Sequence, residues 1–241
     1  MGYALFIFGP AGTGKSTFCS KLVEHGKIIH RQFNLINFDP AQTNTKTDYL
    51  IDIRKYITTT EIMEECDFGP NGSLMVAFDE LYKNIDEIEI EEYSNEYLIF
   101  DFPGQIELFM HTSSMNNIIN YFSKFFKISI LYFLEGQCVY DVNKFMGNLL
   151  CGFISMSRFD YFMFFVFSKV DLVGKEKIEN FLENLENLSE GNKMYKKILD
   201  LAQVDFKMID YSDEDSINDL LYWVDNNLQY YDDVDIFQDN E

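Results

Sequence analysis

Short apolar runs recur along the chain, and segments with helical spacing separate them. The apolar runs cover residues 3–8, 33–38, 97–100, 128–134 and 161–167. Strands that are buried on both faces have this composition, and parallel sheets covered by helices are built from such strands. The segments 16–25, 72–85, 142–156 and 175–188 carry apolar residues at helical spacing. This alternation predicts an α/β fold with a doubly wound, mainly parallel sheet that has helices on both faces.

The length of 241 residues suits one domain, because α/β folds of this size often form a single core. The sequence shows neither internal repeats nor a linker-like segment. We therefore expect a single domain over residues 1–230. Residues 231–241 are expected to form a short, acidic and mobile tail.

A glycine-rich segment, GPAGTGKST at residues 9–17, lies between the first apolar run and the first helical segment. It fits the P-loop pattern G-x-x-x-x-G-K-[ST], in which backbone N–H groups and a helix N-terminus face a phosphate. Lys15 would reach the β and γ phosphates, and the Ser16 hydroxyl would ligate Mg²⁺. The predicted nucleotide contacts of this segment are Gly12, Thr13, Gly14, Lys15, Ser16 and Thr17. The alternative reading is an ordinary glycine-rich turn.

Two further apolar runs end in a carboxylate. Asp101 ends the run 97–100 and begins a D-x-x-G pattern, so it would hold Mg²⁺ directly or through water while the Gly104 N–H contacts the γ phosphate. Asp39 follows the run 33–38 and is a second candidate Mg²⁺ ligand. The alternatives are that Asp101 caps the next turn and that Asp39 forms a turn before Pro40.

The segment FSKVDL, residues 167–172, matches a relaxed form of the base-reading motif N-K-x-D. Asp171 would accept hydrogen bonds from N1–H and the 2-amino group of guanine, which adenine lacks. The aliphatic stem of Lys169 would lie along the base, and Ser168 stands where asparagine is commoner. The alternative is that Asp171 caps a helix.

Hydrolysis of a γ phosphate needs an oriented water and positive charge. Asp39, Gln105 and Glu107 are candidates for orienting the water, although the last two could instead cap a helix start. The three arginines of the sequence lie outside the glycine-rich segments, so an arginine finger is not expected. Lys15, Mg²⁺ and backbone N–H groups would then carry the electrostatic stabilisation.

The stretch CDFGPNGSLM, residues 66–75, has the local chemistry of a tight surface turn. Asn71 can both donate and accept hydrogen bonds, so its amide could hold a water or a phosphate oxygen. Pro70 limits the entropy of this loop, and Gly69 permits close approach.

The composition of the chain indicates which kinds of binding partner and which cellular compartment to expect. The formal net charge of −21 disfavours direct binding to nucleic acid or to anionic membranes, and a large partner would present a basic patch, unless the acidity serves only solubility. The four cysteines form no C-x-x-C pair and read as reduced thiols in a cytosolic or nuclear protein. No apolar run has the length of a membrane span. The abundant aromatics allow a self-association surface.

The motifs GPAGTGKST, NFDPAQ, GPNG, DFPGQIELF and SKVDL follow one another in an order that resembles the GPN-loop GTPases. The resemblance covers nearly the whole chain, and segments 51–57 and 211–230 are most similar to the third eukaryotic paralogue. Phe38, Thr43 and Ser168 depart from the family pattern without removing a required chemical group, although the change at Thr43 leaves ligation by that position open.

The resemblance implies a P-loop GTPase of the class that dimerises across its nucleotide sites and binds GTP or GDP with Mg²⁺. It implies that Gly69, Pro70 and Asn71 contact the nucleotide site of a partner protomer. The dimer would be a homodimer or a heterodimer with the first paralogue. The family assists cytoplasmic assembly and nuclear import of RNA polymerase II, so polymerase subunits would be partners of a cytoplasmic protein that shuttles to the nucleus.

Other functions fit the sequence less well. A P-loop kinase would want a lid with several arginines, and a nickel-site metallochaperone would want clustered cysteine or histidine ligands. A GTP-dependent conformational switch or assembly chaperone with negligible hydrolysis stays open beside the GTPase.

Overall fold

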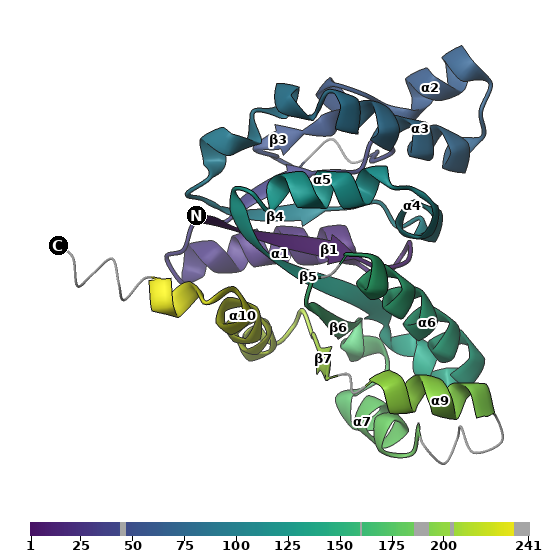
Figure 1. Ribbon diagram of the computed structural model, residues 1–241. Coiled ribbons are helices and arrows are strands. Elements are labelled where there is room, and N and C mark those ends of the chain that lie inside the picture. The colour runs from purple at the N-terminus through teal and green to yellow at the C-terminus, as the bar shows by residue number, and fades with distance from the viewer. Residues whose placement is uncertain (44–46, 160, 186–192, 203–204, 234–241) are drawn as a thin grey trace.

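A single parallel sheet forms the centre of the computed structural model, which describes residues 1–43, 47–159, 161–185, 193–202 and 205–233 (Figure 1). Within these residues the sheet has seven strands in the order β3-β2-β4-β1-β5-β6-β7, and every neighbouring pair is parallel. The strands are β1 (Gly2–Phe8), β2 (Asn34–Asn37), β3 (Ile51–Asp52), β4 (Tyr97–Asp101), β5 (Phe126–Glu135), β6 (Met163–Ser168) and β7 (Phe206–Met208). The predicted fold class is confirmed.

Helices cover both faces of this sheet (Figure 1). One face carries α1 (Lys15–Ile28) and α10 (Glu214–Leu228). The other face carries α3 (Pro70–Lys83), α4 (Ile106–His111), α5 (Ser114–Phe122), α6 (Val142–Phe159), α7 (Lys175–Glu183) and α9 (Lys193–Ala202), while α2 (Thr59–Cys66) packs on α3. Short 3₁₀ turns follow three of the strands, namely η1 (Ile53–Lys55) after β3, η4 (Gly136–Tyr140) after β5 and η5 (Val170–Leu172) after β6. Two more, η2 (Ile85–Ile88) and η3 (Ile90–Tyr93), connect α3 to β4.

Strand β1 shows why the apolar runs are continuous. Phe6 and Phe8 pack under the layer that contains α5, whereas Leu5 and Ile7 pack under α1 and α10. Side chains alternate between the faces of a strand, so a strand covered on both faces needs an apolar residue at every position.

The pattern of apolar runs does not predict two short strands. β3 spans two residues and β7 spans three, and both lie at the edges of the sheet. Strands this short bury too few residues to leave a periodic signal.

The GPN stretch is the start of a helix rather than a tight turn. Gly69 caps α3, and Pro70 is its first residue, two positions before the predicted helical segment. Proline fits the first turn of a helix because its missing N–H would have no partner there. The predicted helix 175–188 is shorter, since α7 ends at Glu183 and residues 186–192 lie outside the described part.

The C-terminal end packs on the sheet through a buried ion pair. Arg31 donates to both carboxylate oxygens of Asp225 at 2.5 and 3.2 Å, and Tyr97 donates to the same carboxylate at 3.3 Å. The Arg31 guanidinium lies 4.1 Å from the centre of the Tyr230 ring. Asp225 is completely buried.

The packed region continues past residue 230. Asp233 accepts hydrogen bonds from the Tyr3 hydroxyl at 2.6 Å and the Lys127 ammonium at 2.7 Å. Residues 231–233 of the expected tail are therefore in contact with the domain, and residues 234–241 lie outside the described part.

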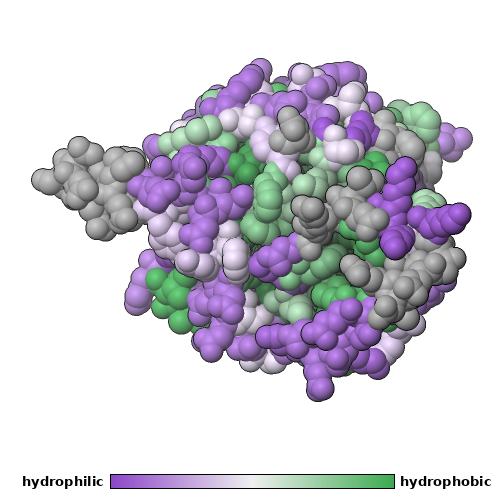
Figure 2. All heavy atoms as spheres, turned by 60° about the horizontal axis from the view of Figure 1, so that its bottom comes forward, coloured by the Kyte–Doolittle hydropathy of each residue, from purple (hydrophilic) through white to green (hydrophobic). Residues whose placement is uncertain are grey.

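The surface mixes hydrophilic residues with smaller hydrophobic areas on the face that Figure 2 shows. Tyr222, Trp223 and Tyr231 are exposed in and just after α10, and the Tyr222 ring contacts the rings of the other two. The predicted self-association surface stays a prediction. No helix among the described residues is long and apolar enough to span a membrane.

We expect Asp225→Ala to lower the free energy of unfolding by about 3–5 kcal/mol, because it leaves the Arg31 charge without its buried partner. Denaturant unfolding measures this change. The matched control is Asp232→Ala, which removes an exposed carboxylate and should stay within about 0.5 kcal/mol of the unsubstituted protein. A loss below about 1 kcal/mol for Asp225→Ala would contradict a structural role of the pair.

Candidate nucleotide site

Most of the predicted site segments follow strands of the sheet, whereas the GPN stretch opens α3. The P-loop follows β1, Asp39 follows β2, Asp101 ends β4, and Ser168 ends β6. The strands are parallel, so these ends lie at one edge, where ligands of open α/β sheets bind. β4 lies between β2 and β1, which places both carboxylates beside the P-loop.

The P-loop adopts a conformation that only its glycines allow at low cost. Gly12 and Gly14 have φ angles of 79° and 86°, in the left-handed region. Gly14 caps α1 without a side-chain hydrogen bond, so it leaves the first N–H groups of the helix to a ligand. The Thr13 hydroxyl donates to the Pro10 carbonyl at 2.9 Å and fixes the loop, while Thr17 is exposed on the first turn of α1.

Lys15 lies buried against its own loop. Its Nζ donates to the carbonyls of Gly9 at 2.9 Å and Pro10 at 3.1 Å. A Cβ on Gly104 would lie 2.9 Å from this Nζ and 2.6 Å from the Ala11 Cα, so the turn after β4 requires glycine. Burial lowers the pKa of Lys15, and the carboxylates of Asp101 and Asp39 oppose this shift.

Asp101 has one unpartnered carboxylate oxygen. Its side chain is buried and accepts a hydrogen bond from Ser16, whereas Oδ2 has no hydrogen-bond partner. Burial raises the pKa of Asp101 to about 6, against the hydrogen bond from Ser16 and the charge of Lys15. A buried carboxylate oxygen without a partner is costly, so the site is suited to a cation.

Asp39 is half-buried at the same end of the site. Its Oδ1 accepts from the Ala41 N–H at 2.9 Å, and burial raises its pKa against this bond and the charges of Lys15 and Arg54. Ser16, Asp101 and Asp39 therefore fit Mg²⁺, which binds few protein oxygens and keeps phosphate and water ligands. Among the described residues, no group of three or more His, Cys, Asp or Glu side chains could hold a metal ion.

The three candidates for orienting a water differ in their partners. Gln105 precedes α4, and its side-chain oxygen is buried without a hydrogen bond. Glu107 is exposed and accepts from the Asn71 amide at 3.2 Å. The start of α3 thus lies beside the segment that follows β4, within one chain. Gly69 and Pro70 are exposed beside Asn71.

The base-reading motif contacts the P-loop through Ser168. Its hydroxyl is buried and donates to the Thr13 carbonyl at 2.6 Å, so this residue supports the phosphate loop from behind. Lys169 donates to Glu135 at 2.9 Å. Asp171 is exposed in η5 and lines a pocket of ≈ 320 Å³ together with Asp210.

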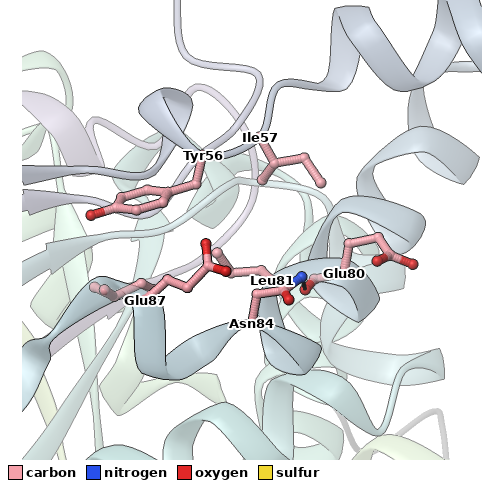
Figure 3. Close-up of a pocket in the computed structure, with 7 residues that line it drawn as sticks. Tyr56, Ile57, Glu80, Leu81, Asn84 and Glu87 are labelled. Carbon is pink, nitrogen blue, oxygen red and sulfur yellow. Dashed lines mark hydrogen bonds between the residues drawn. The ribbon is translucent and has the colours of Figure 1, made fainter.

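A second pocket is too small for a nucleotide. It has a volume of ≈ 60 Å³ and lies between the segment after η1 and the C-terminal end of α3, where Tyr56 faces Glu87 (Figure 3). Asn71 begins the same helix, about 20 Å away by the rise of an α-helix. None of the residues that line this pocket belongs to the P-loop.

Several residues near the site were given no role in the sequence analysis. Tyr211 donates to the Gly14 carbonyl at 3.2 Å, and Asn37, Gln42, Asp52 and Arg54 form a network beside Asp39. The contact between Tyr211 and the P-loop joins residues 197 positions apart, and local sequence patterns carry no signal of such contacts.

A solved structure has the same architecture. The crystal structure of a GTPase in its apo form from Pyrococcus abyssi superposes with a TM-score of 0.77 and 20% sequence identity. The match covers 93% of this chain and 97% of that chain. At this identity the likeness shows the fold, which is that of the P-loop NTPases.

Sequence comparison identifies the family. The model described as "Conserved hypothetical ATP binding protein" matches residues 7–230. GPN-loop GTPase 3 of Saccharomyces cerevisiae is 34% identical over 94% of this chain and 92% of its own length, and that of Dictyostelium discoideum is 31% identical over 95% and 88%. The resemblance to the third paralogue is thereby confirmed. The P-loop, the carboxylates of β2 and β4 and these matches together show that the chain belongs to the GPN-loop GTPase family.

Proposed function

We propose that this protein binds GTP with Mg²⁺ and hydrolyses it to GDP and phosphate. The buried Asp101 carboxylate carries the proposal, because its Oδ2 has no hydrogen-bond partner while the Ser16 hydroxyl and the Lys15 charge both act on the same carboxylate. A cation at Asp101 and Ser16 would then lie next to a phosphate held by Lys15. The family names of the relatives support the same activity.

The phosphate chain would lie along the N–H groups that open α1. Lys15 would exchange its loop carbonyls for the β and γ phosphate oxygens, and the nearby Gly104 N–H would donate to the γ phosphate. Mg²⁺, held by Ser16, Asp101 and Asp39 directly or through water, would neutralise charge on the phosphates. A water oxygen attacks the γ phosphorus, and the bond to the β–γ bridging oxygen breaks.

Gln105 and Asp39 are the better placed groups for orienting that water. The Gln105 side-chain oxygen is buried and unpartnered, and Asp39 lies close enough to Lys15 to influence its pKa. Glu107 holds Asn71, so we assign it the positioning of the GPN loop.

The base would be guanine. The family model's description mentions ATP, whereas the relatives are named GTPases. Asp171 favours guanine, because an exposed carboxylate accepts two hydrogen bonds from this base and none of the same kind from adenine. The Lys169 ammonium is held by Glu135, which leaves its stem to pack beside the ring.

We also propose that two GPN-loop GTPase protomers assemble as a homodimer or as a heterodimer with the first paralogue. Asn71 is exposed at the start of α3, where a second protomer can reach it. The family resemblance supports a role in assembly and nuclear import of RNA polymerase II, in a cytoplasmic protein that shuttles to the nucleus.

We expect the protein to turn over GTP in the presence of Mg²⁺ and to bind GTP at least 100-fold more tightly than ATP. Asp171→Asn should reduce this preference to below about tenfold, because an amide nitrogen opposes the guanine N–H donors. Calorimetric titration and phosphate release measure the two properties. Lys15→Ala serves as the control that loses the affinity for both nucleotides.

Two outcomes would redirect this proposal. Equal affinity of the unsubstituted protein for ATP and GTP would contradict the base assignment. Tight GTP binding without turnover, alone and with the first paralogue, would favour the conformational switch.

Asn71→Ala should lose at least tenfold in GTP turnover, and a mixing experiment tests whether the loop acts across a dimer. Asn71→Ala protomers have an intact phosphate site, and Lys15→Ala protomers have an intact loop. If Asn71 acts in the partner's site, mixing the two inactive variants restores turnover in the mixed dimers. If the Asn71–Glu107 contact acts within one chain, the mixture stays inactive. Unchanged turnover of Asn71→Ala at rising protein concentration would remove Asn71 from the mechanism.

A further inference from the structure

A network of polar side chains connects η1 to the P-loop through the turn after β2. Its members are Asn37 at the end of β2, Gln42 in the turn, Asp52 at the end of β3 and Arg54 in η1. The sequence places Arg54 outside every glycine-rich segment, but the parallel pairing of β2 with β3 brings it beside Asp39.

The Arg54 guanidinium is fixed in orientation. Its Nε donates to Asp52 Oδ1 at 2.9 Å, and its Nη2 donates to Asp52 Oδ2 at 2.5 Å. Asn37 Nδ2 donates to the same Oδ1 at 2.8 Å and holds the carboxylate from the other side. A two-point arginine–carboxylate pair sets direction as well as distance.

The remaining nitrogen of this guanidinium holds the turn after β2. Arg54 Nη1 donates to the Gln42 carbonyl at 2.9 Å. At the other end of the turn, the Asp39 N–H donates to Asn37 Oδ1 at 3.1 Å. The turn that carries Asp39 is therefore held at both ends by one connected network.

Gln42 extends this network to the P-loop, since its Nε2 donates to Ser16 Oγ at 3.4 Å. A serine hydroxyl has one donor and two acceptor positions. The Ser16 hydroxyl stabilises the charged form of the Asp101 carboxyl, as a donor to it would, and Gln42 uses one acceptor position of Ser16. One lone pair is left, and the two bonds fix where it points.

We propose that Arg54 is a positioning residue that acts through Gln42 to set the affinity of the site for Mg²⁺. The inference rests on the proposed function, because it assigns Ser16 to Mg²⁺. Arg54 acts from behind the turn and not as an arginine finger, since three of its nitrogens are bound to Asp52 and Gln42. Outer groups that orient a metal ligand typically change metal affinity 10- to 100-fold.

The test measures the Mg²⁺ concentration that half-maximally slows the release of a fluorescent GDP analogue, a binding measurement that needs no turnover. Arg54→Ala and Gln42→Ala should each raise this concentration about tenfold. The release rate in excess chelator should stay unchanged, because Lys15 and the loop N–H groups are untouched. Arg54→Lys keeps the charge but loses the two-point pair. Its half-maximal Mg²⁺ concentration should therefore lie closer to that of Arg54→Ala than to that of the unsubstituted protein.

Arg158→Ala is the matched control, because that arginine also donates to backbone carbonyls, those of Phe109 and Thr112, but lies outside the network. It should keep the Mg²⁺ dependence of the unsubstituted protein. If Arg54→Ala does not fold, the Mg²⁺ dependence of Gln42→Ala tests the inference instead, since Arg54 acts through Gln42.

The outcomes separate this inference from the proposed function. If the unsubstituted protein binds GDP but Gln42→Ala keeps the same Mg²⁺ dependence, the inference is overturned while the nucleotide site stands. An Arg54→Lys variant that behaves like the unsubstituted protein would also overturn it, because charge alone would then suffice. If the unsubstituted protein binds no guanine nucleotide, the proposed function itself fails.

Discussion

Strand β1 pairs in parallel with β4 on one side and with β5 on the other, and the geometry of the nucleotide site depends on that pairing. The register places Ile7 opposite Asp101, so the carboxylate lies next to the residues that start the P-loop. The pairing of β2 with β4 then brings Asp39 to the same edge. Beyond the glycine turns and Lys169, whose φ of 54° lies in the left-handed region, the site residues need no unusual backbone, because the strand ends already converge.

An acidic chain must nevertheless attract a polyanion. The net charge of −21 works against GTP at long range, so binding depends on local groups. Lys15 is one buried ammonium between two carboxylates, and the N–H groups that open α1 add partial positive charge. The two carboxylates repel a phosphate group unless a cation lies between the carboxylates and the phosphate. Under the proposed function, the same residues would make the affinity for nucleotide depend on Mg²⁺.

Some parts of this protein could be predicted from its sequence, and the division has physical causes. Strands covered on both faces give continuous apolar runs, so the central strands of the sheet can be predicted from the sequence. Phosphate binding requires the spacing of Gly9, Gly14 and Lys15, so the P-loop can be predicted as well. The helix start at Pro70 cannot be predicted from the local sequence, because glycine, proline and asparagine also favour turns. The role of Arg54 was hidden because its partners, Asp52, Gln42 and Asn37, meet only through strand pairing. Ser168 was assigned to the base by its motif, whereas its buried hydroxyl holds the P-loop.

The contact between the two ends of the chain has a consequence for biosynthesis. Tyr3 lies on the central strand, yet its hydroxyl donates to Asp233, 230 positions later. Leu5 and Ile7 are covered by α1, which follows β1 directly, and by α10, which is translated long after them. The part of this face that α10 covers therefore stays exposed on the ribosome until residues 214–228 have emerged, so the nascent chain depends on protection from aggregation until then.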